Sequence, residues 1–213
     1  NWGIIGISLR SSDTRDSLAP QDFLYTEATL GETTDFRVIG SLLNILVAPE
    51  SPAAVVAQVA NPHTKLVTTT ITEKGYYLNS GAINFEHPSL VAELKSLEAP
   101  QTIYGYLAAA LIARQQQSAT TLSILCCDNV QGGGMHLSNG VQKLLQRHDS
   151  ACAEWTQSNV SFSSSMVDRV APKTSDTLRK LVVDTTGLED AWPVSAEPFS
   201  QWVIEDNFAA ERP

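Results

Sequence analysis

Apolar runs of strand length alternate along this chain with longer segments of helical pattern, and this alternation restricts the fold more than any other feature. Five runs are strand candidates, at residues 2–9, in part of 37–48, and at 65–72, 121–127 and 160–167. Strands that alternate with helices are typical of proteins in which helices cover a parallel sheet. The sequence therefore predicts an α/β fold with a largely parallel sheet and flanking helices.

Three segments have the pattern of helices, at residues 51–61, 102–117 and 136–157. The first opens with Ser51 and Pro52, a typical N-cap followed by a proline in the first helical position. Segments 30–36 and 172–180 are rich in turn-forming residues, and we interpret them as connectors or short helix starts.

The composition argues against two classes of partner. The chain has 213 residues, 43% of them hydrophobic, with a formal net charge of −9 and no long cluster of Lys or Arg. A surface for nucleic acid or for an anionic membrane needs such a cluster. The longest apolar stretch, residues 106–113, is too short to cross a bilayer, and no signal-peptide pattern is visible. We expect neither nucleic acid nor membrane as a partner.

The cysteines and histidines do not form a metal motif. The chain has three cysteines, Cys126, Cys127 and Cys152. An odd number with this spacing fits neither a disulfide framework nor a zinc site. The four histidines are scattered. We expect no metal, and we expect buried thiols in a reducing, cytoplasmic environment.

Polar residues follow four of the expected strands, where parallel sheets bind their ligands. The first strand is followed by Arg10 and Asp13, and the third ends near Thr72 and Glu73. The remaining two clusters are Asp128 with Asn129 and Asp168 with Arg169. A packed core has no need of these groups, so the pattern points to a site along the strand ends.

Asp13 and Arg10 allow opposite interpretations. An acid in this position of a dinucleotide-binding fold accepts hydrogen bonds from the adenosine ribose and repels a 2′-phosphate. A guanidinium can instead hold that phosphate or stack on adenine. Asp13 could equally be a turn residue that satisfies its own backbone.

The glycine-rich segments do not form a phosphate loop. No G-x-G-x-x-G occurs, and Gly3 and Gly6 lie inside a strand pattern. The run Gly132–Gly134 follows a strand and precedes a helix, but it lacks the spacing and the Lys-Ser/Thr of such a loop. It permits either a close backbone approach or a loose turn, and we favour the turn.

Two charged pairs at the strand ends can also be interpreted in more than one way. Glu73 and Lys74 could bind ribose or position a substrate, or they could form an exposed ion pair of little energetic value. Asp168 and Arg169 could be structural or could face a ligand. No G-x-S-x-G elbow is present, which argues against a hydrolase of that type.

Taken together, the segments "WGIIGISLRSSD", "TITEKGYY", "CDNVQGGG", "SMVDRVAP" and "EPFSQWVIEDNF" resemble the polyol-specific long-chain dehydrogenases. This is the family of mannitol 2-dehydrogenase and fructuronate (mannonate) reductase. The resemblance covers essentially the whole chain in the same order, and the segments 18–26 and 187–194 are more similar to the mannitol branch.

The resemblance implies a Rossmann-like cofactor domain without its first strand and its glycine-rich turn. In the family, a mostly helical substrate domain follows and carries a Lys/Asn/His block, which is absent from these 213 residues. We therefore expect residues 1–172 to be the NAD(P)-binding domain. Residues 173–213 would end that domain and lead to the absent helical one.

The resemblance also implies roles for single residues. Asp13 matches the acid that selects the coenzyme, with Arg10 beside it, and Thr72 and Glu73 match residues that line the cofactor cleft.

At the other two strand ends, Asn129 matches an amide that binds and polarises the substrate oxygen. Asp168 matches a residue near the nicotinamide and the catalytic lysine, and Val167 lies beside the ring. Asn129 and Asp168 are thus the expected catalytic residues, and both also count among the expected cofactor contacts.

Some positions depart from the family pattern. Gly133-Gly134 and Ser138 replace an Asn-Gly pair and an Arg, Ser163 replaces a Pro, and Ala196 replaces a Cys. A looser loop around Asn129 is the expected consequence.

The resulting hypothesis is a metal-independent polyol dehydrogenase of carbohydrate metabolism that uses NAD, with NADP as the open alternative and a lysine base outside this chain. A hexuronate reductase and a nucleotide-binding module without turnover are the competing hypotheses. The partner would be a sugar alcohol or ketose, a monomer is compatible with the sequence, and the isolated fragment is expected to be inactive.

Overall fold

The computed structural model describes residues 2–169, 171–209 and 212. By their internal contacts these residues form two compact units. The first unit comprises Asn1–Ser51 and Asp168–Gln201, and the second comprises Pro52–Val167 and Trp202–Pro213. The expected division at residue 172 concerns the domains of a longer protein and stays a prediction.

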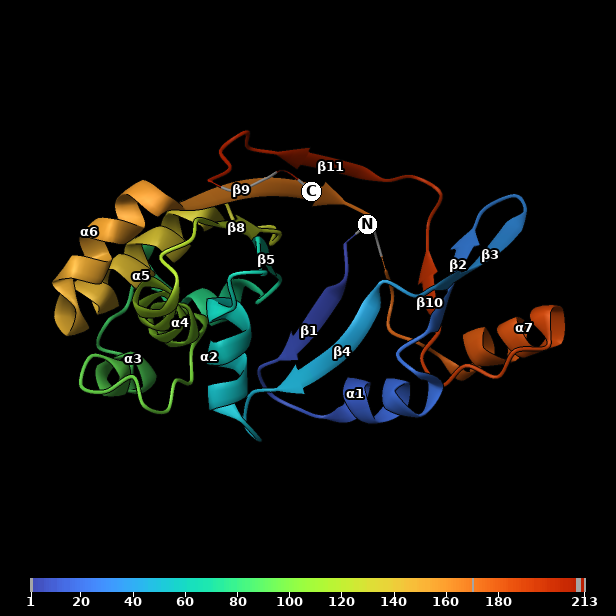
Figure 1. The fold of residues 1–213 in the computed structure, drawn as a ribbon. Coiled ribbons are helices and arrows are strands. Elements are labelled where there is room, and N and C mark those ends of the chain that lie inside the picture. Colours follow the sequence, from blue (N-terminus) through green and yellow to red (C-terminus); the bar gives the residue numbers. More distant parts are fainter. Residues whose placement is uncertain (1, 170, 210–211, 213) are drawn as a thin grey trace. The chain divides into compact units, whose positions relative to one another are not determined.

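The first unit contains two small sheets and two helices. Strands β1 (Ile4–Ser8) and β4 (Leu42–Val47) pair in parallel (Figure 1). A second sheet has the order β10-β2-β3, in which β2 pairs in parallel with β10 and antiparallel with β3. Its strands and the remaining elements are β2 (Tyr25–Leu30), β3 (Thr34–Ile39), β10 (Val194–Ala196), α1 (Asp13–Leu18), η1 (Ala19–Gln21) and α7 (Asp176–Thr186).

The second unit is built on a four-stranded sheet with the order β11-β9-β8-β5, in which β8 pairs in parallel with both β5 and β9. The strands are β5 (Leu66–Thr69), β8 (Leu122–Cys126), β9 (Val160–Asp168) and β11 (Gln201–Ile204). A short antiparallel ribbon joins β6 (Leu78–Asn79) to β7 (Ala82–Ile83). The helical elements are α2 (Pro52–Ala60), η2 (Glu73–Tyr76), α3 (Pro88–Glu93), α4 (Ile103–Gln117), α5 (Gly133–His148) and α6 (Ser150–Asn159).

The main hydrophobic core lies in the second unit, between β8 and the helices α4 and α5. Every residue of β8 is buried, as expected for a central parallel strand. Helix α5 contributes Leu137, Val141, Leu144 and Leu145, which are fully buried and recur at helical spacing. The predicted α/β architecture with a largely parallel sheet is thus confirmed.

A buried guanidinium stabilises the connections around α4. The Arg114 side chain is fully buried, and its nitrogens donate to the carbonyls of five residues at 2.8–3.1 Å. The acceptors belong to Val59, Asn61, Thr64, Thr120 and Thr121. Arginine suits this position because it presents five N–H donors in one rigid plane.

The prediction of one helix at residues 136–157 is wrong in one respect, because the structure has two consecutive helices there, α5 and α6. Asp149 adopts an extended conformation with φ −156° and ψ 93°, which ends α5. Its carboxylate then accepts a hydrogen bond from the Cys152 N–H at 2.9 Å and caps α6. The capping aspartate was visible in the sequence, but the apolar pattern continued across it.

Segment 30–36, predicted to be a connector or a short helix start, is the connector of the β2–β3 hairpin with its flanking strand ends. Strand β2 itself was not predicted. The expected strand 65–72 ends early, at Thr69. By contrast, segment 172–180 does contain a helix start, since Ser175 accepts a hydrogen bond from the Leu178 N–H and caps α7.

The glycine run after β8 is not a loose turn, so that prediction is wrong. Gly132 has φ +68°, and Gly133 and Gly134 are buried in the first turn of α5. A Cβ at Gly133 would lie 2.2 Å from the Cys126 Sγ, and one at Gly134 would lie 2.6 Å from the Ser163 carbonyl carbon. The glycines therefore let α5 approach β8 and β9 more closely than any side chain would permit.

Candidate functional site

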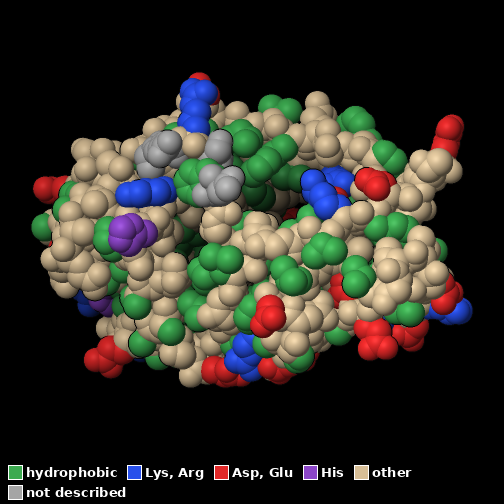
Figure 2. Space-filling model, turned by 45° about the vertical axis from the view of Figure 1, so that its right-hand side comes forward, with side chains coloured by type: hydrophobic (Ala, Val, Ile, Leu, Met, Phe, Trp, Pro, Cys, Tyr) green, Lys and Arg blue, Asp and Glu red, His purple; other side chains and the backbone are tan. Residues whose placement is uncertain are grey.

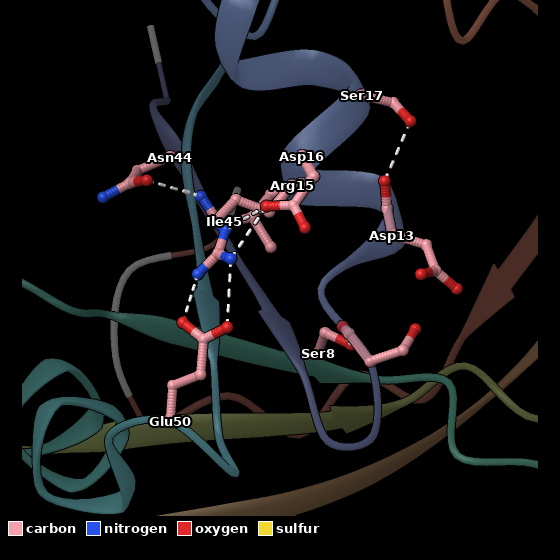
Figure 3. Close-up of polar contacts among 9 residues, drawn as sticks. Ser8, Asp13, Arg15, Asp16, Ser17, Asn44, Ile45 and Glu50 are labelled. Atoms are coloured by element: carbon pink, nitrogen blue, oxygen red, sulfur yellow. Dashed lines mark hydrogen bonds and ion pairs between the residues drawn. The ribbon is translucent and has the colours of Figure 1, made fainter.

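In the first unit, the connection after β1 presents Arg10 and Asp13. Both side chains are exposed, and neither forms a side-chain hydrogen bond or ion pair with another described residue. Asp13 begins α1, and its carboxylate points away from the neighbouring polar groups in Figure 3. Only its backbone carbonyl is engaged, by the Ser17 hydroxyl at 2.9 Å. The carboxylate is therefore free to accept hydrogen bonds from a ligand.

Asp16, the second acid in the first turn of α1, is held by Arg15. The guanidinium donates to the Asp16 carboxylate at 2.8–2.9 Å and to both Glu50 oxygens, which lie in the turn after β4 (Figure 3). Hydrogen bonds from Ser12 and then Arg15 lower the pKa of Asp16 below its ordinary value. This network fixes the start of α1 and distinguishes the occupied Asp16 from the free Asp13.

In the second unit, three parallel strands bring the predicted residues to one edge of the sheet. Thr69, Cys126 and Ser164 are aligned across β5, β8 and β9. Thr72, Asn129 and Val167 each lie three positions beyond this row. Because the carboxyl ends of parallel strands meet at one edge, the three residues lie at the same edge, where α/β proteins bind ligands.

The turn after β5 has an unusual backbone. Thr72 has φ +64° and ψ 159°, a conformation that is strained for a β-branched residue. Its N–H donates to the Asp128 Oδ1 at 3.0 Å, and the Tyr76 hydroxyl donates to the Asp128 Oδ2 at 2.7 Å. Asp128 is 9% exposed. This buried carboxylate thus joins the turn after β5 to the turn after β8.

The side chains that this edge presents are open to solvent. Asn129, Thr72, Glu73 and Val167 are exposed. No ion pair joins Glu73 to Lys74 in the described part of the chain, so that interpretation of the pair is not supported. An exposed amide, a threonine, a carboxylate and an apolar side chain are suited to a polar organic ligand rather than to a metal ion.

Asp168 and Arg169 have different environments. Asp168 is the exposed last residue of β9 and falls in the first unit. The Arg169 guanidinium lies 2.7 Å from the Glu27 Oε1, and Arg37 lies 2.7 Å from the Glu27 Oε2. Burial acts to raise the pKa of Glu27, but the two guanidiniums outweigh it, and the net pKa is lowered. The structural interpretation of Arg169 is therefore supported. The Asp168 side chain forms no hydrogen bond or ion pair with another residue that the structure describes.

The Glu27 cluster lines a cavity of about 360 Å³ in the first unit. Its walls also include Tyr25, Ile39, Ser41 and Val194 from β2, β10 and the region around β3. Glu27 in its wall is already paired with two arginines. The carboxylate is therefore not available as an unpaired charge for a ligand.

Burial disfavours the thiolate form of two of the three cysteines. Burial raises the pKa of the Cys127 thiol, and it raises the pKa of Cys152 to about 11. Cys126, Cys127 and Cys152 are free, and all but the half-buried Cys127 are buried. Since the thiolate is the reactive form, neither Cys127 nor Cys152 is set up as a nucleophile.

Three further properties bear on possible ligands. Among the described residues, no group of three or more His, Cys, Asp or Glu side chains is placed to hold a metal ion. No helix in the described ranges combines the length and the apolarity needed to cross a membrane. On the face shown in Figure 2, the coloured Lys and Arg side chains are scattered among acidic and apolar ones and form no basic patch.

Of the predicted site residues, the structure brings Thr72, Glu73, Asn129 and Val167 together at one sheet edge of the second unit. Arg10 and Asp13 lie together after β1 in the first unit, which also contains Asp168. Sequence reasoning missed the role of Asp128 and Tyr76. Their separation of 52 positions along the chain gave no signal, although Asp128 stands directly before Asn129.

Strands alternating with helices and polar groups beyond the strand ends define a Rossmann-like α/β domain of the nucleotide-binding class. Comparison with known proteins narrows this class. The family model described as "Mannitol dehydrogenase Rossmann domain" matches residues 1–213. The chain belongs to the mannitol dehydrogenase family and corresponds to its Rossmann domain, which confirms the resemblance seen in the sequence.

Two relatives illustrate the similarity. The chain is 40% identical over 220 residues to a mannitol 2-dehydrogenase of Pyrenophora tritici-repentis. It is 38% identical over 219 residues to the mannitol dehydrogenase DSF1 of Saccharomyces cerevisiae. Each alignment includes the whole chain but only 39% and 44% of the relative, respectively.

Solved structures show the same fold. Pseudomonas fluorescens mannitol 2-dehydrogenase, in a ternary complex with NAD and D-mannitol, matches with a TM-score of 0.93 and 37% identity. A D-sorbitol dehydrogenase in substrate-free form matches with a TM-score of 0.91 and 34% identity. The chain is covered completely in both cases and spans 44% and 46% of those structures.

Proposed function

We propose that this chain is the cofactor-binding part of an NAD-dependent polyol dehydrogenase that interconverts a mannitol-like sugar alcohol and its ketose. The observation that carries the proposal is that Thr72, Asn129 and Val167 each lie three positions beyond the aligned residues Thr69, Cys126 and Ser164 of three parallel strands. The chain also shares its fold with a mannitol 2-dehydrogenase solved with NAD and D-mannitol. We further propose a cytoplasmic location and a small-molecule substrate.

In this proposal, Asp13 binds the coenzyme. Its free carboxylate accepts hydrogen bonds from the adenosine ribose hydroxyls and repels a 2′-phosphate, which favours NAD over NADP. Arg10 beside it stacks on the adenine. The fit is supported by the exposed and unpaired state of both side chains within the described residues.

The chain's other residues orient the reacting groups. The exposed Asn129 amide donates a hydrogen bond to the substrate oxygen and stabilises negative charge that develops there. Val167 packs beside the nicotinamide, and Thr72 and Glu73 line the cleft. Asp168 tunes the pKa of the lysine base, which by family resemblance lies outside these residues. When bound, NAD supplies the hydride acceptor for the carbinol carbon.

A substrate screen tests the proposal. The full-length protein is supplied with NAD and with mannitol, arabinitol, sorbitol or mannonate, and NADH formation is followed by absorbance. We expect turnover with mannitol above that with the other polyols and above mannonate. Turnover with mannonate alone would replace the proposal with the hexuronate reductase, and NAD binding without any turnover would leave a nucleotide-binding module.

A further inference from the structure

The carboxylate of Asp128 is buried at the strand edge but has no place in the proposed chemistry. Its Oδ1 accepts a hydrogen bond from the Thr72 N–H at 3.0 Å, and its Oδ2 accepts one from the Tyr76 hydroxyl at 2.7 Å and a longer one from the Cys126 thiol at 3.9 Å. A buried carboxylate is costly to maintain without such donors. The bonds from Thr72 and Tyr76 connect the bend after β8 to the turn after β5.

The turn that Asp128 holds is strained and needs support. Thr72 has φ +64°, a sparsely populated conformation that is strained for a β-branched residue. A strained backbone persists only where its surroundings determine it. The hydrogen bond from the Thr72 N–H to Asp128 holds the backbone in this conformation. No side chain caps the start of η2, which begins at the next residue.

The other partner, Tyr76, is itself fixed. Its ring is fully buried, and its backbone carbonyl accepts a hydrogen bond from the fully buried Tyr104 hydroxyl at 3.0 Å. The Tyr76 hydroxyl also lies 2.8 Å from the Sγ of the buried Cys126. The Tyr76 hydroxyl is thus a rigid anchor for Asp128.

The anchored Asp128 restricts the backbone of the next residue, Asn129. Asn129 follows directly in the same bend and is exposed at the edge, and its side chain has no hydrogen bond with another described residue. Its backbone is therefore oriented by its neighbours, of which Asp128 is the anchored one. We propose that Asp128 is a positioning residue, held by Thr72 and Tyr76, that aims the Asn129 amide at the substrate oxygen.

This inference rests on the proposed function, in which Asn129 contacts the substrate. It is tested in the full-length protein with Asp128→Asn, Asn129→Ala and the double variant. Removing one donor to a developing oxyanion costs about 10²–10³ in kcat, which we expect for Asn129→Ala. A misplacement of about 1 Å costs on the order of 10²-fold, so we expect Asp128→Asn to lower kcat at least about tenfold.

The double variant distinguishes an effect of Asp128 through Asn129 from a general structural disturbance of the protein. If Asp128 acts through Asn129, Asp128→Asn has no further effect on kcat once the amide is removed. Tyr76→Phe, which keeps the carboxylate and removes one donor, should lower kcat in the same direction and covers the case in which Asp128→Asn does not fold.

The matched control is Asp149→Asn, the same chemical change at the carboxylate that caps α6. We expect its kcat to stay close to that of the parent, with thermal unfolding measured for every variant. Parental kcat in both Asp128→Asn and Tyr76→Phe, or losses that multiply in the double variant, would overturn this inference alone. No polyol turnover by the unmodified protein, or parental turnover by Asn129→Ala, would overturn the proposed function together with it.

Discussion

At the scale of single residues, two acids in the first turn of α1 differ in what they bind. The Asp16 carboxylate is paired with Arg15, whereas the Asp13 carboxylate has no partner among the described residues. We predict that Asp13→Asn weakens NAD binding about tenfold, because a charge-assisted hydrogen bond contributes roughly 1.5–3 kcal/mol. Binding of NADP should improve relative to NAD, since the repelling charge is removed. Titration of the full-length protein with both coenzymes measures this change.

The control for Asp13 is Asp16→Asn, the same change three positions further along α1. Its carboxylate is already occupied by Arg15 and Ser12, so we expect the NAD-to-NADP preference to stay as in the parent. An equal loss of preference in both variants would show that the net charge of the turn, rather than a contact of Asp13, selects the coenzyme.

Glu27 gives the first unit a dependence on pH. Arg37 and Arg169 lower its pKa in the folded state, so its ionised form stabilises the fold above the unfolded pKa of about 4.3. That stabilisation is lost as the pH falls through the lower folded value. We predict that Glu27→Gln lowers the unfolding free energy at pH 7. Below about pH 5, the unfolding free energy of this variant should fall less steeply with decreasing pH than that of the parent. Urea unfolding at a series of pH values measures both effects.

Glu32→Gln provides the comparison for Glu27. Glu32 is exposed in the β2–β3 turn and has no ion pair with a described residue. We expect the unfolding free energy of Glu32→Gln to fall with decreasing pH as steeply as that of the parent. If Glu27→Gln shows the parental slope as well, the two guanidiniums do not stabilise the carboxylate in the folded protein.

At the scale of secondary-structure elements, the packing of α5 against β9 depends on Gly134. A Cβ there would lie 2.6–2.9 Å from backbone atoms of Ser163 and Ser164, which cannot move aside as a side chain can. We predict that Gly134→Ala lowers the free energy of unfolding by about 1–3 kcal/mol, as overpacking does in other cores. Denaturant unfolding measures this loss.

Asn139→Ala is the control on the same helix. Asn139 is exposed in the middle of α5, where alanine is the better helix former, so we expect no loss or a slight gain. A parental stability for Gly134→Ala would mean that α5 can shift away from β9 at little cost.

At the scale of the whole molecule, the length of the chain relative to its relatives leads to a prediction about activity. The chain spans less than half of the relatives to which it is similar. We predict that the 213 residues alone produce no NADH from mannitol, while the full-length protein does. The reason is that the lysine base and the glycine-rich turn lie outside them by family resemblance. Turnover by the isolated chain would overturn the assignment of the base.

Much of the fold could be predicted because its signals are local. The apolar runs at β1, β5, β8 and β9 and the helical pattern of α4 lie within single segments, and parallel pairing follows from their alternation. The polar residues after the strands were visible for the same reason. The break between α5 and α6 was not predicted, because a local cap at Asp149 prevailed over a continuing apolar pattern.

The sequence by itself determined the α/β class, the family resemblance and the residues at the strand ends, since these depend on residue type and on short spacings. Only the tertiary structure decided that Asp128 holds Thr72 and Tyr76, and that Gly133 and Gly134 are packed rather than loose. Those contacts join residues that are dozens of positions apart. They form because neighbouring parallel strands end at one edge of the sheet, where distant segments meet.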